Sequence, residues 1–215
     1  FGVENYEEAN TRLLLEKDNW SGLVIDSSEN NINHIKSQNY FWRHNLTALS
    51  HFISAENINE ILKENNFKGE IGVLSIDTDG NDFWIWKEIS QIKPVILVIE
   101  YNAKLGSEKS LSIKYNSNFR RASSGLDKLI YGASLKALEK ISEEKGYSLV
   151  CTNKNGNNAF FVRDDYLNQK IYKQSTQQCF KMSSFREYLD ESDLQYMDDK
   201  SIFNFLINSG KFVEV

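Results

Sequence analysis

Two apolar runs that end in acidic residues constrain the fold of this chain more than any other feature. The first run, residues 71–76, leads into Asp77 and Asp79, and the second, residues 95–99, leads into Glu100. Short apolar runs of this kind predict buried strands, and open α/β sheets bind ligands outside the carboxyl ends of such strands. We therefore expect two neighbouring strands with an acidic site at their ends. Alternatively, these acids cap the helices that follow, because Asp and Asn favour that position.

The rest of the chain alternates between short apolar strands and amphipathic helices. This alternation predicts an α/β protein, specifically a Rossmann-like three-layer sandwich with a mostly parallel sheet and helices on both faces. The turn Asn155-Gly156 predicts that the sheet ends in an antiparallel hairpin. Strands are expected at the end of residues 1–3 and at 22–26, 46–52, 71–76, 95–101, 147–152 and 158–163, and helices at 10–17, 30–37, 81–91, 133–145 and from Ser54 onward.

The 215 residues are expected to form one domain, residues 1–164, with a tail. The tail, 165–215, is polar with helical patches at 185–189 and 202–207, so we expect a helical extension packed on the domain. The segment 103–130 is too long for an ordinary connection, and such segments are commonly lids or disordered loops. It carries six basic and two acidic residues, so it either attracts an anionic substrate or is simply a solvated loop.

Composition excludes some classes of function. The formal net charge of −5 argues against general nucleic-acid binding, and no apolar run is long enough to predict a membrane span. The two cysteines, Cys151 and Cys179, form no metal-binding motif, and we interpret them as free thiols of a cytoplasmic protein. The chain begins at Phe1 without a methionine, which leaves open whether further residues precede it.

The first two predicted strands carry a weak signal for an adenosine ligand. A turn follows the first strand, and Asp26 ends the second. An acid in that place can accept hydrogen bonds from ribose hydroxyls. An Asp before Ser27-Ser28 is as often a helix cap, so this signal does not stand alone.

Several short motifs, taken together with the order of elements, resemble a known family. The pattern looks like a class I S-adenosylmethionine-dependent methyltransferase, and more narrowly like the bacterial FkbM-like group, which is often associated with surface-polysaccharide or other sugar modification. The resemblance covers about residues 1–165. Its motifs are Asn10-Thr11, Trp20-Ser21-Gly22, Ile76-Asp77-Thr78-Asp79-Gly80-Asn81-Asp82, Ile99-Glu100-Tyr101-Asn102, Tyr131-Gly132-Ala133-Ser134-Leu135 and Asn158-Ala159-Phe160-Phe161-Val162-Arg163.

The resemblance implies S-adenosylmethionine as cofactor and assigns residues to its parts. Gly2 and the turn after it would approach the methionine part, and Asp26 would bind ribose. Asp77 would face the methionine or the methyl group, while two residues after the third strand would lie near adenine. The cofactor-binding set implied in this way is Gly2, Asn10, Asp26, Ala55, Glu56 and Asp77.

The first turn departs from the family pattern. The family has further glycines where this chain has Glu4 and Tyr6, and glycine permits positive φ and close backbone approach. A rival hypothesis is therefore a degenerate, non-catalytic methyltransferase fold that serves as a binding or partner subunit. A third is a nucleotide-sugar enzyme of another reaction type, since fold does not fix function. An active methyltransferase should bind the cofactor and keep an open pocket beside Asp77.

The expected reaction is O-methylation of a sugar or other small hydroxylated acceptor, with or without a phosphate group. Methyl transfer depends on positioning, and a hydroxyl acceptor needs a base or a metal to remove its proton. The candidate catalytic residues are Asp77 and Asp79, whose carboxylates could act as the base. His51 is a weaker candidate, because a structural histidine is more common.

The remaining candidates concern metal, substrate and assembly. Asp77, Glu100 and Asn102 could form an all-oxygen Mg²⁺ site, or the acids could simply hydrogen-bond to backbone and cofactor. We expect the substrate to contact Tyr101, Arg120 and Arg121. The sequence does not decide the oligomeric state, and it is compatible with a homodimer.

Overall fold

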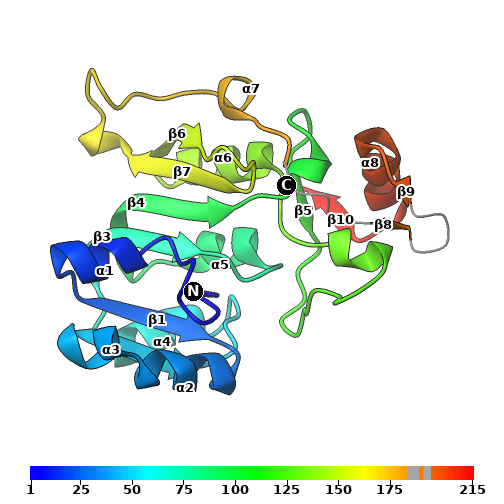
Figure 1. Cartoon of the computed structure of the whole chain (residues 1–215). Helices are drawn as coiled ribbons and strands as arrows, with labels where there is room; N and C mark the ends of the chain where they lie inside the picture. The colour runs from blue at the N-terminus through cyan, green and yellow to red at the C-terminus, as the bar shows by residue number, and fades with distance from the viewer. Residues whose placement is uncertain (184–188, 191–194) are drawn as a thin grey trace.

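The structure is a computed structural model that describes residues 1–183, 189–190 and 195–215. It is an α/β protein (Figure 1). Its helices are α1 (Arg12–Asp18), α2 (Glu29–Ser37), α3 (Asn39–Arg43), α4 (Ile58–Glu64), α5 (Asp82–Glu88), α6 (Leu135–Glu144), α7 (Thr176–Cys179) and α8 (Asp199–Asn208), with 3-10 turns η1 (Ala103–Leu105), η2 (Leu126–Leu129) and η3 (Asp164–Tyr166). None of these helices is long and apolar enough to cross a membrane.

A mixed four-stranded sheet forms the centre of the molecule. Its strand order is β3-β4-β7-β6, with β3 (Gly69–Ile76) parallel to β4 (Ile92–Glu100) and both β7 (Asn158–Arg163) and β6 (Tyr147–Thr152) in antiparallel pairs. The predicted hairpin is confirmed. The expectation of a mostly parallel sheet is not, because the hairpin contributes half of this sheet.

A separate parallel pair lies beside this sheet. It contains β1 (Gly22–Asp26) and β2 (Leu46–Ser50), with Asp26 opposite Ser50 at the carboxyl end. Helix α2 follows β1 because the Ser28 hydroxyl accepts a hydrogen bond from the Asn31 N–H, which satisfies an otherwise unpaired donor of the first turn. Ser54 was expected to cap the next helix, but α4 begins at Ile58, with Asn57 at its N-cap.

The first two residues connect the pair to the four-stranded sheet. The Phe1 ammonium donates to the Ser75 carbonyl (2.7 Å), and the Phe1 carbonyl accepts from the Asp77 N–H (3.1 Å). On the other side, the Gly2 N–H donates to the Ile25 carbonyl (2.9 Å). Residues 1–3 are not a strand in the structure, yet this short stretch has strand-like hydrogen bonds to both β1 and β3.

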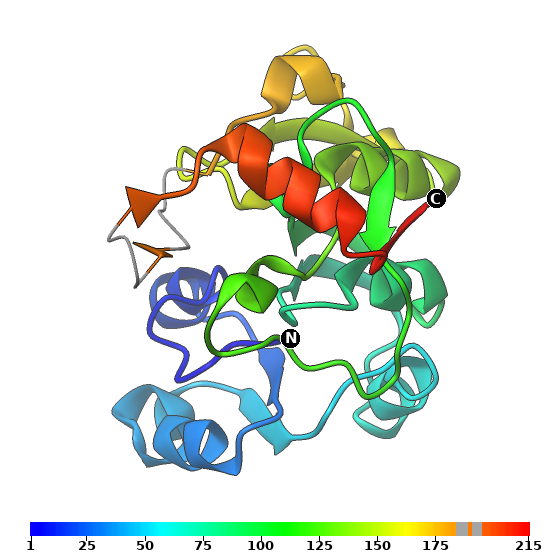
Figure 2. The same ribbon diagram turned by 90° about the vertical axis from the view of Figure 1, so that its right-hand side faces the viewer.

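The segment 103–130 and the tail build a third unit together. Strand β5 (Leu111–Ile113) pairs antiparallel with β10 (Phe212–Glu214), and α8 lies beside η1, as Figure 2 shows with α8 in red. Leu105, Leu129 and Leu206 are among the residues of their shared apolar core. The segment is therefore not a structureless loop, and the tail is not purely helical.

One further expectation concerned the tail. The helical patch at 202–207 is confirmed as part of α8. The patch at 185–189 lies outside the described residues except for Leu189, which belongs to β8 (Leu189–Asp190), paired with β9 (Gln195–Tyr196).

Candidate active site

A cavity of about 330 Å³ lies at the carboxyl ends of β1, β3 and β4; we call it the strand-end cavity. The first turn closes one side, and residues from the segment 103–130 close another. Elements distant in sequence meet here because parallel strands end at the same edge of a sheet. Among the expected site residues, its lining includes Gly2, Asp26, His51, Asp77, Asp79, Glu100 and Arg121.

The first turn keeps a backbone conformation that usually requires glycine. Gly2 has φ +66°, and a β-carbon there would lie 1.6 Å from the Asp77 carbonyl oxygen, so only glycine fits. Glu4 and Tyr6 also have positive φ, 47° and 69°. Such a conformation costs roughly 1–2 kcal/mol for a residue with a side chain. Burial of the Tyr6 ring offsets that cost, and its hydroxyl lies 3.2 Å from the Thr11 hydroxyl.

Asp26 is a buried carboxylate that organises the turns around it. It accepts hydrogen bonds from the Glu4 N–H (2.8 Å), the Ser28 N–H (2.8 Å) and the Asn31 amide (3.1 Å). A carboxylate can accept about four hydrogen bonds. Capacity for a ligand hydroxyl therefore remains, and the capping role and the ligand role are compatible.

Asp77 and Glu100 form a pair of neighbouring carboxyl groups on β3 and β4. Burial raises the pKa of Asp77 to about 7, with further contributions from the negative charges of Asp82 and Asp79. Burial and the proximity of Asp77 raise the pKa of Glu100 well above its usual range. A side-chain hydrogen bond joins the two carboxyl groups, and their mutual repulsion adds to the effect of burial on both pKa values.

The loop between β3 and α5 is held by Asp82. Its buried carboxylate accepts from the Thr78 N–H (2.7 Å), the Thr78 hydroxyl (3.0 Å) and the Gly80 N–H (3.0 Å). Asp82 therefore closes the loop and does not cap α5, whose N-cap is Asn81 without a side-chain cap hydrogen bond. Asp79 instead projects outward at φ +57° and contacts Arg121 at 2.6 Å.

Segment 103–130 covers the cavity from outside. The Arg121 guanidinium also donates to the Lys128 carbonyl (2.8 Å) and lies 3.6 Å from the centre of the Tyr131 ring. Phe119 packs on Gly80, where a β-carbon would come within 2.3 Å of its ring. Phe119 and Asn81 are lining residues that the sequence did not indicate as ligand contacts. The segment 103–130 shows no clear periodicity or motif that could have revealed Phe119.

Two oxygens of the cavity residues have no partner within the described part of the chain. They are Asn81 Oδ1 and Glu100 Oε2, and both are buried. Buried polar atoms are almost always hydrogen-bonded, so orphaned acceptors in a cavity indicate a ligand that donates hydrogen bonds. The Asn81 side chain is itself fixed, because its amide donates to the Asn116 carbonyl (2.8 Å).

Two of the expected residues lie inside the protein and away from the cavity. The Tyr101 ring is buried and its hydroxyl donates to the Lys181 carbonyl (2.8 Å). The Asn102 amide donates to the carbonyls of Leu129 and Tyr131, both at 3.0 Å, and its oxygen accepts from the Lys104 N–H. Both residues hold later segments in place, and neither lines the cavity.

Four other expected residues are near the site but outside its lining. The Asn10 amide donates to the Ser75 hydroxyl (3.1 Å) in a different cavity. The Ala55 N–H donates a hydrogen bond to the Tyr115 hydroxyl, and that hydroxyl donates to the Glu56 carboxylate. These two bonds join the stretch after β2 to the segment 103–130. Arg120 is exposed and lies 4.8 Å above the Phe52 ring.

The donor set for a metal ion is incomplete. The described residues contain no group of three or more acidic, histidine or cysteine side chains suited to a metal. Asn102 is fully engaged by backbone groups, which leaves Asp77 and Glu100 of the expected ligands. Mg²⁺ requires near-octahedral oxygen coordination, and these two carboxyl groups alone supply only part of it. Comparisons of the chain with protein-family models, curated proteins and solved structures found no match.

Proposed function

We propose that this chain is an S-adenosylmethionine-dependent methyltransferase that methylates a hydroxyl group of a sugar-like small molecule. In this proposal β1-β2 and β3-β4-β7-β6 are two parts of one Rossmann-like three-layer sandwich. The hydrogen bonds of Phe1 and Gly2 to both parts support that interpretation. The protein would act in the cytoplasm on a small molecule, with no nucleic acid or membrane involved.

The observation that carries the proposal is the convergence of Gly2, Asp26 and Asp77 on one cavity with orphaned acceptors. Such a cavity favours a ligand that is cationic and rich in hydroxyl groups. S-adenosylmethionine has a sulfonium, an ammonium and a ribose diol. Asp26 supplies a carboxylate for the diol. Asp77 and the oxygens of Asn81 and Glu100 supply acceptors for the ammonium and a negative field for the sulfonium.

The geometry also provides a base. When bound, S-adenosylmethionine supplies an electrophilic methyl group. Asp77 would take the acceptor's hydroxyl proton while the oxygen–carbon bond forms and the carbon–sulfur bond breaks, its electron pair remaining on sulfur. A base is most effective when its pKa lies near the working pH, and burial brings the pKa of Asp77 to about 7. Glu100 keeps Asp77 in place through the hydrogen bond between their side chains.

The acceptor would approach beneath the residues 119–121. Phe119 offers an apolar surface beside Asp77, and the exposed guanidinium of Arg120 can attract an acceptor that carries a phosphate or carboxylate. Asp79 and Arg121 form the rim through their ion pair. Binding of a sugar there requires hydroxyl partners, which Asp79 can supply.

A turnover assay tests the proposal. The chain is incubated with methyl-labelled S-adenosylmethionine and a panel of free, phosphorylated and nucleotide-linked sugars, and S-adenosylhomocysteine formation is measured. We expect turnover with at least one acceptor, and turnover at least a hundredfold slower for Asp77→Asn. Binding of S-adenosylhomocysteine without turnover on any acceptor would favour the non-catalytic alternative, and the absence of binding would overturn the proposal.

A further inference from the structure

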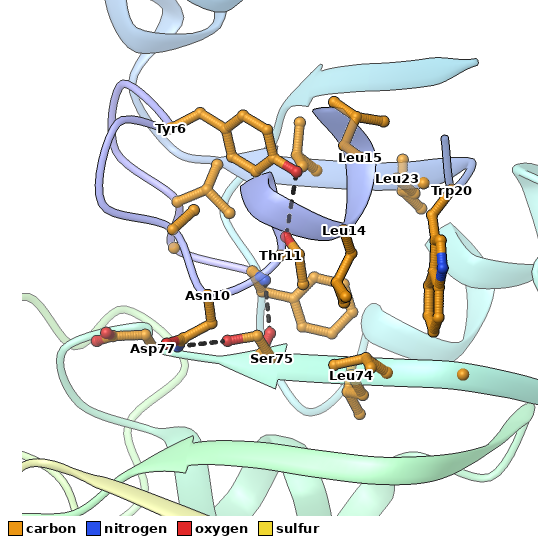
Figure 3. A pocket seen from close by; sticks show the side chains of 18 of the residues that line it. Tyr6, Asn10, Thr11, Leu14, Leu15, Trp20, Leu23, Leu74, Ser75 and Asp77 are labelled. Atoms are coloured by element: carbon orange, nitrogen blue, oxygen red, sulfur yellow. Dashed lines mark hydrogen bonds between the residues drawn. The ribbon is translucent and has the colours of Figure 1, made fainter. Parts of the chain in front are cut away.

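A second cavity lies between the facing edges of β1 and β3, and we call it the strand slot. Its volume is about 510 Å³. It adjoins the strand-end cavity at Gly2 and Asp77, which line both. Figure 3 shows Asn10, Ser75 and Asp77 together at one end of the strand slot, with the Trp20 ring at the other. One end of the slot is therefore polar and lies beside the proposed base.

The turn between β6 and β7 contributes asparagine side chains to this polar end. Asn158, the first residue of β7, is paired with Glu100, the last residue of β4. The turn therefore lies at the same edge of the sheet as the carboxyl ends of β3 and β4. The asparagines of this stretch that line the slot are Asn153, Asn155, Asn157 and Asn158.

Asn153 holds the turn in shape. Its side-chain oxygen accepts hydrogen bonds from the N–H groups of Gly156 (3.1 Å), Asn157 (3.2 Å) and Asn158 (3.1 Å), and its amide donates to Asn157 Oδ1 (2.7 Å). The turn is also pressed against the chain after α7, because a β-carbon at Gly156 would lie 2.6 Å from the Met182 carbonyl oxygen. The shape of the turn is thus fixed without any contribution from the Asn158 side chain.

The side chain of Asn158 is buried and incompletely bonded. Asn158 is only 9% exposed, and its Oδ1 has no hydrogen-bond partner within the described residues. A buried acceptor without a partner destabilises the fold, so native proteins rarely retain one without a reason. Asn153 already supplies the hydrogen bonds of the turn, which leaves a ligand as the reason for Asn158.

Asp77, Glu100 and Asn158 form a row across the ends of β3, β4 and β7. Ile76 is opposite Ile99, so Asp77 follows beside Glu100, and a hydrogen bond joins these two side chains. Glu100 is in turn opposite Asn158, and side chains at paired positions point to the same face of a sheet. Neighbouring strands are roughly 4.8 Å apart, so the row spans about 10 Å. A single hydroxyl group cannot reach both ends of this row, whereas a ring with several hydroxyl groups can.

We propose that Asn158 binds the acceptor sugar, with one ring hydroxyl donating to Asn158 Oδ1 while another is held at Asp77 for methylation. This role rests on the proposed function and extends the acceptor site from residues 119–121, across Asp77, to the β6–β7 turn. It also orients the acceptor. The carboxyl groups of Asp77 and Glu100 repel anions, so a neutral ring lies at Asn158 and any phosphate lies toward Arg120.

The test follows the side-chain amide signal of Asn158 in the isotope-labelled chain as neutral sugars are added. The probes are the methyl glycosides of glucose, galactose and mannose, followed by the monodeoxy analogues of the one that binds most tightly. We expect a saturable shift of the Asn158 amide signal with at least one probe. This measurement on the wild-type chain needs no variant, so it holds even where a substitution prevents folding.

Two variants then separate binding from structure. Asn158→Leu removes the acceptor at nearly constant volume, and Asn155→Leu is the control, since Asn155 lines the same wall but is exposed. We expect the Kd of the probe to rise about tenfold for Asn158→Leu and to change less than about twofold for Asn155→Leu. The Tm of Asn158→Leu should equal or exceed that of wild type, because an apolar side chain leaves no orphaned oxygen.

The deoxy analogues identify the hydroxyl that Asn158 binds. One analogue should bind about tenfold more weakly to wild type, yet no more weakly than its parent to Asn158→Leu, because the partner group is already absent. Additive losses for every analogue would overturn the pairing.

Two further results would overturn the proposal. One is the absence of any saturable shift at Asn158 with all the probes. The other is unchanged sugar affinity in Asn158→Leu together with a lowered Tm, which would make Asn158 a structural residue. Binding of S-adenosylhomocysteine to wild type is measured separately by calorimetry. Sugar binding at Asn158 without cofactor binding would reject the proposed function, and cofactor binding without sugar binding would reject the role of Asn158 alone.

Discussion

The strand-end cavity and the strand slot, the cavity of about 510 Å³ between the facing edges of β1 and β3 (Figure 3), share Gly2 and Asp77 but differ in chemistry. The strand-end cavity contains Asp26, Asp77 and Glu100, with two buried oxygens that have no partner within the described residues. The strand slot is lined by leucine and phenylalanine side chains together with asparagine, serine and threonine, and in the described part of the chain the facing strands β1 and β3 pair only with β2 and β4. Apart from the Asn158 oxygen, its unpaired groups belong to the backbone, whereas those of the strand-end cavity belong to side chains.

Because of this difference, the two cavities suit two different kinds of ligand. Open strand edges with apolar faces recognise backbone and can take any apolar segment of the right length. Side-chain carboxyl groups with shifted pKa values in a cleft are typical of functional sites, because chemistry needs groups poised near the working pH. The larger cavity is therefore not the candidate active site. The following predictions test whether the two cavities can be perturbed independently.

The largest effect is expected from Asp77→Asn. An amide of the same size cannot accept the proton, so kcat should fall by about 10²–10⁴, the range for loss of a general base. Cofactor affinity should change much less, because the transition state loses more than the ground state. Steady-state kinetics with a matched Asp127→Asn variant, whose side chain is exposed and outside the lining of the cavity, provide the control. A kcat within threefold of wild type would remove Asp77 from the mechanism.

Gly2→Ala should damage both cavities together. The added methyl group would collide with the Asp77 carbonyl, and the positive φ adds strain. We expect a loss of about 2–4 kcal/mol in unfolding free energy, by analogy with overpacking and backbone strain. Urea unfolding measures it, and Gly210→Ala is the control, since that glycine also has positive φ but has no atom within 4 Å of a β-carbon. Equal losses for the two variants would contradict the close approach.

Asp26→Ala should weaken S-adenosylhomocysteine binding by about 1–3 kcal/mol, the scale of hydrogen bonds to a charged group. Asp26 also holds the turns at Glu4 and Ser28, so Asp26→Asn separates the roles. The amide oxygen can keep part of the turn but carries no charge. Calorimetry on both variants, with circular dichroism to check folding, measures the effect. Wild-type affinity in a folded Asp26→Ala variant would reject the ribose assignment.

Glu100→Gln should change how stability depends on pH. The folded-state pKa of Glu100 is raised, so the folded protein keeps a proton that the unfolded chain releases above its ordinary pKa. The wild type therefore loses stability as pH rises above about 4.5, and the variant should lose less. Between pH 5 and 8, the slope of the unfolding free energy against pH should differ between wild type and variant by up to about 1.4 kcal/mol per pH unit. Parallel curves for the two proteins would show that the proton is not held there.

The smallest effect is expected from Arg120→Glu. The side chain is exposed beside Phe52, so its charge acts through solvent. We expect the KM of an anionic acceptor to rise about two- to fivefold at low salt, and less at high salt because ions screen exposed charges. Lys211→Glu, in the turn before β10, is the charge-matched control. Equal KM at every ionic strength would exclude steering by Arg120.

Much of the fold followed from local patterns. The bounds of β1, β6 and β7 agree with their apolar runs, while β3 starts two residues earlier than expected and β4 spans 92–100 where 95–101 was expected. The third unit was not predictable in this way. Its strands β5 and β10 pair residues about a hundred positions apart, as in Leu111 with Glu214, and no local periodicity signals such a pair.

The candidate site was predictable up to the strand ends and no further. Asp26, Asp77 and Glu100 lie at those ends, where topology fixes their position. Tyr101 and Asn102 follow directly after β4, but the chain turns there into η1, and their side chains point into the protein. Phe119 reaches the cavity through a segment whose course depends on the tail.

The most direct test of the account is to map the amide chemical shifts of the isotope-labelled chain as S-adenosylhomocysteine is added. The account predicts saturable shifts at Asp26, Thr78 and Asn81 in the strand-end cavity. It predicts unchanged shifts at Leu14, Leu23 and Val73 in the strand slot. Shifts confined to the slot residues, or no shifts at saturating ligand, would contradict the assignment of the acidic cavity as the cofactor site.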